Sequence, residues 1–107
     1  MKITLPSLLV AYDLFGLMSA VDPNLFRNMA GLNIQVPGGA IEAANGGAVV
    51  KIGQPNAGAT AVDEDIVLVE GESQNFPTTG RNTISLVGRS AIATVDNCVL
   101  YVTALTA

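Results

Sequence analysis

Three groups of residues in this chain could take part in chemistry, and each lacks partners that its chemistry needs. Cys98 is the only cysteine, and the sequence contains no histidine, so a thiol nucleophile has no imidazole to act as its base. A single cysteine also cannot form an internal disulfide. Since Cys98 precedes the apolar run 99–102, we expect a buried, unreactive thiol.

The second group is the segment 53–60, Gly-Gln-Pro-Asn-Ala-Gly-Ala-Thr, whose glycine spacing is that of a phosphate-binding loop. Ala59 stands where such a loop has the lysine that reaches the phosphates, and no helical pattern follows it. Without that charge the loop loses its main electrostatic contribution to phosphate binding. The segment therefore predicts an ordinary turn built from Gly, Pro and Asn.

The third group is acidic: five of the nine carboxylates lie at positions 63, 64, 65, 70 and 72. The spacing of a calcium-binding loop is absent, so a solvated acidic loop is favoured over a cation site, which stays open as an alternative. Glu70 and Glu72 would share one face of a continuing strand, as a pair of catalytic acids does. Nothing around them favours a raised pKa. We therefore predict a protein that is not an enzyme, with no catalytic residues, no cofactor and no metal ligands.

Charge argues against nucleic acid as a partner. The net charge is −4, and the five basic residues are scattered singly at positions 2, 27, 51, 81 and 89. Binding to a phosphate backbone requires clustered Lys and Arg.

Apolar residues are in excess for so small a chain. They make up 50% of the 107 residues, whereas charged residues make up 13% against a usual share of about 25%. A chain of this length forms one domain with a thin core. Some of its apolar surface should therefore be covered by sister chains or by another protein.

The N-terminal quarter carries helical spacing. Pro6 can open a helix, and Leu8, Leu9, Tyr12 and Phe15 follow at helical intervals, with further apolar residues between them. Such a helix would be apolar on nearly every face and enclosed by other elements. Its apolar run of about 14 residues is shorter than the roughly 20 needed to cross a membrane, so we predict no membrane span.

A second short helix is predicted after it. Asp22 and Pro23 have the pattern of an N-cap followed by a first-turn proline, Leu25 and Phe26 supply an apolar stripe, and Gly31 would end the helix. Residues 6–30 thus predict two helices in a bent arm, either packed in the core or exposed at an interface.

The rest of the chain alternates with a period of two residues between turn signals. Asn45-Gly46 is a dipeptide favoured in tight hairpins, and Glu70-Gly71, Thr79-Gly80, Gly88-Arg89 and Asp96-Asn97 predict further turns. The expected strands are 33–36, 40–44, 48–52, 66–70, 83–87, 91–95 and 99–105. We predict a mainly β fold, an antiparallel β-sandwich or small barrel with an N-terminal helical arm: residues 1–32 form the arm and residues 33–107 the β-rich body of a single domain.

The predicted interface consists of large apolar residues that so thin a core is not expected to cover. It contains one residue of the β body, Phe76, which precedes Pro77 and either fills the core or anchors a partner. The remaining interface residues lie on the arm: Leu8, Leu9, Tyr12, Phe15, Leu25 and Phe26.

The acidic balance, the short strands rich in Ala, Val and Thr (Thr83-Ile-Ser-Leu-Val87, Ala91-Ile-Ala-Thr-Val95) and the strand that ends at Ala107 resemble the small capsid-decoration or cement proteins of tailed bacteriophages. This resemblance covers most of the chain in style and contains no diagnostic motif, and the apolar arm departs from it. It implies a β-rich module, commonly trimeric, that packs over junctions between major capsid subunits. Its place would be the virion, after assembly in the host cytoplasm.

We therefore expect a structural assembly protein that stabilises a particle. The alternative is a carbohydrate- or peptide-binding β module, for which the aromatic residues are few and lie mostly in runs typical of a core. An enzyme subunit that shares its site with another chain is a third possibility, and no residue supports it.

Overall fold

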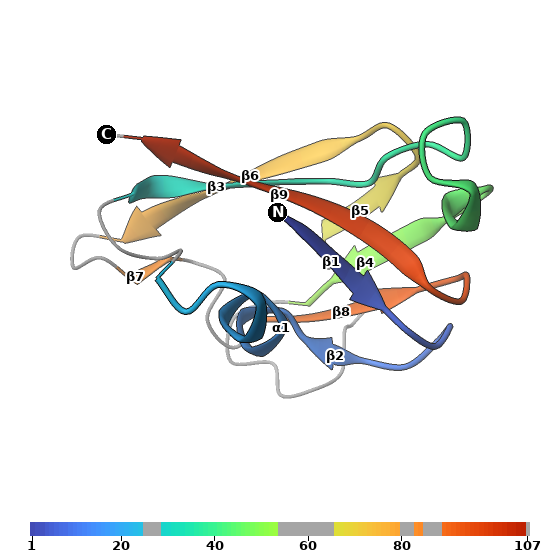
Figure 1. Ribbon diagram of the computed structural model, residues 1–107, viewed down its shortest axis with the longest axis horizontal. Coiled ribbons are helices and arrows are strands. Elements are labelled where there is room, and N and C mark those ends of the chain that lie inside the picture. The colour runs from blue at the N-terminus through green and yellow to red at the C-terminus, as the bar shows by residue number, and fades with distance from the viewer. Residues whose placement is uncertain (25–28, 54–65, 80–82, 85–88, 107) are drawn as a thin grey trace.

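The structure is a computed structural model, and it describes residues 1–24, 29–53, 66–79, 83–84 and 89–106. The main chain forms two antiparallel sheets in two layers, with one short helix near the N-terminus (Figure 1). This confirms the mainly β prediction. The layers do not close into a barrel, so the sandwich is the correct one of the two predicted architectures.

The first sheet has the strand order β1-β9-β3-β6-β7, and the second has the order β2-β8-β4-β5. The elements in chain order are β1 (Lys2–Leu5), β2 (Tyr12–Asp13), α1 (Leu14–Val21), β3 (Met29–Gln35), the 3₁₀ helix η1 (Ala43–Asn45), β4 (Val49–Ile52), β5 (Ile66–Val69), β6 (Ser73–Thr79), β7 (Thr83–Ile84), β8 (Ser90–Ala93) and β9 (Cys98–Thr106).

The core lies between the two layers and is built by period-two alternation. In the five-stranded sheet, β1, β9 and β3 turn every second side chain inward, and β6 contributes Phe76. The four-stranded sheet does the same from β4, β5 and β8. The buried apolar side chains that meet there include Ile3, Leu5, Leu32, Ile34, Phe76, Leu100 and Val102 of the first sheet and Val50, Ile52, Leu68, Ala91 and Ala93 of the second.

The helix closes one side of this core. Leu14 and Met18 are four residues apart, so they lie on the same face of α1, and both are fully buried. Asp13 precedes the helix in an extended conformation, and a Cβ on Gly16 would lie 2.9 Å from its carboxylate oxygen. A side chain at position 16 would therefore require the exposed Asp13 carboxylate to move.

The predicted helical arm is wrong in extent. A short N-terminal helix exists, but it covers only Leu14–Val21. Residues 2–5 pair with β9 as a strand, and Tyr12–Asp13 pair with β8. The second helix cannot reach Ala30 because β3 begins at Met29, and Gly31 lies within that strand rather than at a helix end. The boundary at residue 32 between arm and body therefore divides a single sandwich.

Most strands of the body were predicted, with two exceptions. Residues 40–44 form turns and the start of η1, so the tight hairpin at Asn45-Gly46 does not form. Strand β6 (Ser73–Thr79) was missed because Pro77 and a run of polar residues gave no alternating pattern. The turns at Gly71 and Asn97 are confirmed, with φ values of 83° and 54°. The turns predicted at Gly80 and Gly88 lie outside the described residues.

Candidate functional site

The two outer faces of the sandwich differ in chemistry, and this difference is the main candidate for a functional feature. Residues that alternate with the buried ones point away from the core. On the five-stranded sheet they form what we call the polar face, whose polar members are Lys2, Thr4, Asn33, Gln35, Ser73, Asn75, Tyr101 and Thr103, with the aliphatic Val99 and Leu105 among them.

The polar face is cross-linked by side-chain hydrogen bonds. The Asn33 Nδ2 donates to Asn75 Oδ1 at 2.8 Å between neighbouring strands β3 and β6. Tyr101 donates its hydroxyl to Glu42 Oε1 at 2.7 Å, and the Lys2 ammonium lies 2.9 Å from the same oxygen. Glu42 comes from the turn before η1, so this cluster joins β1, β9 and that turn.

Each member of the cluster changes the ionisation of the others. The hydrogen bond from Lys2, followed by that from Tyr101, lowers the pKa of Glu42. The pKa of Lys2 and that of Tyr101 are both raised, chiefly by their hydrogen bonds to Glu42. The cluster is therefore a stable ion pair at neutral pH and not a source or acceptor of protons.

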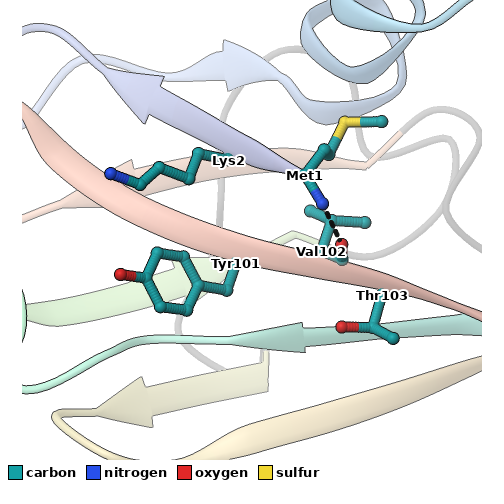
Figure 2. A pocket seen from close by; sticks show the side chains of 5 residues that line it. All are labelled: Met1, Lys2, Tyr101, Val102 and Thr103. Carbon is teal, nitrogen blue, oxygen red and sulfur yellow. Dashed lines mark hydrogen bonds between the residues drawn. The ribbon is translucent and has the colours of Figure 1, made fainter.

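A shallow open depression of about 360 Å³ lies beside this cluster (Figure 2). It is lined by Met1, Lys2, Tyr101, Val102 and Thr103. The Lys2 ammonium lies 5.9 Å from the centroid of the Tyr101 ring. The ring is therefore engaged by a cation as well as by Glu42, which limits its use as a stacking platform for a sugar.

The outer face of the four-stranded sheet is mostly aliphatic. Its members, which we call the aliphatic face, are Val49, Val67, Val69 and Ile92, with Lys51 and Thr94 among them. Val49 lies opposite Val69, and Lys51 lies between Val67 and Ile92 in register. Val67 and Val69 are each 44% exposed, so this face presents hydrocarbon to its surroundings.

At Val69, hydrogen bonds from within the chain occupy the backbone groups at the free edge of this sheet. The Val69 N–H donates to Glu72 Oε1 at 2.9 Å, and the Glu72 N–H donates to the Val69 carbonyl at 3.0 Å. Both backbone groups of Val69 are thus engaged by its own turn. An added strand would have to displace them, so the face is better suited to contact than the edge is.

A second apolar feature lies at the loop between β1 and β2. Leu8, Leu9 and Val10 are consecutive and are 42%, 67% and 44% exposed. The predicted interface residues Leu8 and Leu9 are thus on the surface, although in a loop rather than a helix. Tyr12 and Phe15 are half-buried and pack against the core, so they are not free surface anchors.

The remaining predicted interface residues are either buried or outside the described residues. Phe76 is 1% exposed, so it fills the core and is not an interface residue; the Arg89 guanidinium lies 5.2 Å from its ring centroid. Leu25 and Phe26 lie outside the described residues. No sequence pattern indicates the aliphatic face as a unit, because its members come from three strands that are distant in the chain.

The described residues that could take part in chemistry are buried or hydrogen-bonded within the fold. Cys98 is fully buried, and this burial raises the pKa of its thiol to about 11, so it is protonated at neutral pH. Glu70 accepts a hydrogen bond from the Gly39 N–H at 2.7 Å, and Glu72 holds Val69. The segments 54–60 and 63–65 lie outside the described residues.

Among the residues that the structure describes, no group of three acidic, His or Cys side chains is placed to hold a metal ion. In the same part of the chain, no helix is long and apolar enough to cross a membrane. Comparison with known proteins found no matching family model, no similar curated protein and no similar solved structure.

Proposed function

We propose that this protein is a structural assembly protein without enzymatic activity, which docks through its aliphatic face on a larger protein lattice. The observation that carries this proposal is the contrast between the two outer faces. One is a hydrogen-bonded polar surface, as expected for a sheet that faces water. The other presents Val49, Val67 and Val69 as neighbours, with Ile92 on the far side of Lys51, and Val67 and Val69 are exposed.

The energetics favour burial of the aliphatic face in an assembly. Removing apolar surface from water contributes about 25 cal/mol per Å², and burying one valine or isoleucine fully contributes about 1.5–3 kcal/mol. Contiguous apolar patches on small proteins mark sites of protein contact. Charged residues make up only 13% of the chain, which also favours burial of apolar surface in an assembly.

The lattice we propose is that of a virus particle, with the protein packed on or between major capsid subunits. This step rests on the resemblance to the decoration proteins of tailed bacteriophages, which also favours a trimer. Self-association and capsid docking both use a partner that is a protein, in keeping with a net charge of −4 that disfavours phosphate backbones.

The test is co-sedimentation of the purified protein with megadalton particles isolated from its natural source. We expect Val67→Asp to abolish co-sedimentation, because the new carboxylate would be buried unpaired in an apolar contact. The matched control is Asn75→Asp, which places the same charge on the polar face and should leave co-sedimentation unchanged. Loss with Asn75→Asp and retention with Val67→Asp would contradict the proposal.

The carbohydrate-binding alternative would use the polar face. Its amides and hydroxyls are suited to a sugar, but Tyr101 is the only aromatic residue of that face among the described residues, and Lys2 and Glu42 engage it. The peptide-binding alternative would use a sheet edge. At the edge of β5, the Val69 N–H is already bonded to Glu72. Assembly is therefore the better supported function.

A further inference from the structure

The loop between β1 and β2 combines two properties that rarely occur together in a loop. It presents three consecutive aliphatic side chains, Leu8, Leu9 and Val10, of which Leu9 is 67% exposed. The backbone of Leu9 also has a φ of 57°, in the left-handed region that side-chain-bearing residues rarely adopt. Leucine has no side-chain hydrogen bond to offset this conformation, as Asn and Asp have.

The loop is held in this conformation by bonds at three successive residues. The Ser7 N–H donates to the Tyr12 hydroxyl at 3.0 Å, and the Leu8 N–H donates to Asp96 Oδ1 at 3.0 Å. The Leu9 N–H donates to the Ala93 carbonyl at 2.7 Å. The loop is thus an ordered projection that is tied to β8 and to the turn after it.

Strain of this kind persists only where the surroundings impose it, and it is characteristic of residues with a role in binding. A left-handed Asn or Gly would satisfy the backbone at less cost. The presence of leucine at position 9 therefore points to a use for its side chain outside the molecule, since its exposed fraction shows that the core does not use it.

Resting on the assembly function proposed above, we infer that the Leu8–Val10 loop is the anchor of docking, and that Leu9 inserts into an aliphatic pocket with a basic rim on the partner protein. The loop adjoins the sheet that carries the aliphatic face, because the Leu9 N–H is bonded to the Ala93 carbonyl of β8.

The basic rim follows from charge. Among the described residues, Asp96 in the turn beside the loop brings a carboxylate to it through the bond from the Leu8 N–H, while Lys2 is paired with Glu42. Asp96 uses one oxygen for the Leu8 N–H and leaves a negative charge at the base of the loop. An anionic lipid surface would be repelled there, whereas a Lys or Arg at the rim of a protein pocket would be attracted.

The experiment compares two substitutions that remove equally exposed aliphatic side chains. Leu9→Asn suits the left-handed backbone, so we expect an unchanged or higher melting temperature together with particle binding that is weaker by about tenfold or more. Ile41→Asn is the control: Ile41 is 68% exposed and lies beside Glu42, which contacts the five-stranded sheet, so particle binding should be unchanged.

Co-sedimentation with the purified particles and flotation with vesicles of phosphatidylcholine and phosphatidylserine are the two readouts. Particle binding retained by Leu9→Asn but lost with Val67→Asp would overturn the anchor and leave the assembly function standing. Equal losses for Leu9→Asn and Ile41→Asn would also overturn it. Wild-type protein that floats with the vesicles would assign the loop to a membrane surface, and wild-type protein that binds no particle would refute both proposals.

Discussion

At the scale of single residues, the side chains that suggest chemistry are used to hold the fold. Cys98 sits at the start of β9 with no exposed surface. Its thiol pKa of about 11 lies above the ordinary value of 9.0, because the low-dielectric core disfavours the thiolate. The absence of a base for this thiol was evident from the sequence. Its full burial agrees with the position before the apolar run 99–102.

We predict that Cys98 in the native protein resists alkylation by iodoacetamide at pH 8 and reacts on addition of denaturant. Since the folded pKa is raised, the protonated thiol contributes stability fully below pH 9, and this contribution is lost as the pH rises towards 11. The melting temperature of the wild type should therefore fall more steeply across that window than that of Cys98→Ala. Rapid alkylation of native protein would show an accessible thiol.

The second residue-scale prediction concerns Glu42. Its pKa is lowered by the Lys2 and Tyr101 hydrogen bonds, so its contribution to stability is present above its ordinary pKa of 4.5 and is lost as the pH falls through the folded value. Glu42→Gln should therefore reduce the acid sensitivity of the melting temperature as the pH falls below 4.5. We expect a small effect, because the cluster is open to solvent. Identical pH profiles for the two proteins would contradict this account of the cluster.

Asn45 shows what sequence reasoning missed at this scale. The dipeptide Asn45-Gly46 suggested a hairpin turn, but the Asn45 side chain is fully buried. Its Nδ2 donates to the carbonyls of Pro37 and Val99, and its Oδ1 accepts from the Val99 N–H. This amide takes the place of a neighbouring strand at the start of β9, a role that only the tertiary contact reveals.

We predict that Asn45→Ala destabilises the protein by about 3 kcal/mol, because it leaves backbone groups of Val99 and Pro37 buried without partners. The matched control is Asn33→Ala, which removes the amide that is bonded to Asn75 on the polar face and should cost less than about 1 kcal/mol. Chemical denaturation measures both. Equal costs for the two substitutions would refute the structural role of Asn45.

At the scale of elements, the period-two pattern identified most strands of the body, because their inward side chains are apolar and short turns separate them. It failed where one apolar residue stands among polar ones, as Phe76 does in β6. The prediction of a helix in the N-terminal segment was wrong for the opposite reason. Its apolar residues are so dense that Ile3 and Leu5, which alternate as a strand, were overlooked, while Leu8, Leu9 and Tyr12 fit a helical period by chance.

The strand β1 gives a prediction that separates the observed fold from the expected arm. Leu5→Ala should destabilise the protein by about 2–5 kcal/mol, because Leu5 is fully buried between the sheets. Leu8→Ala should change stability by less than about 0.5 kcal/mol, because Leu8 is exposed in a loop. In a separate helical arm both residues would have the same modest effect on stability, and that outcome in urea denaturation would contradict the pairing of β1 with β9.

At the scale of the whole molecule, composition anticipated the result that a thin core leaves apolar residues unburied. It did not say where they would gather. The strand order β2-β8-β4-β5 brings Ile92, Val49 and Val69 onto one face, although they lie far apart along the chain. The same topology gathers Asn33, Asn75 and Tyr101 on the opposite face. The two-sided character of the molecule is thus a product of strand pairing.

Footprinting by hydroxyl radicals, with the protein free and bound to its particle, tests the central claim most directly. Side-chain oxidation is followed by mass spectrometry at the aliphatic residues of β5, Val67 and Val69, and at Tyr101 on the polar face. We predict strong protection of Val67 and Val69 on the particle and unchanged oxidation of Tyr101. Protection of Tyr101 with unchanged oxidation of Val67 and Val69 would show that the polar face makes the contact, and would contradict the account.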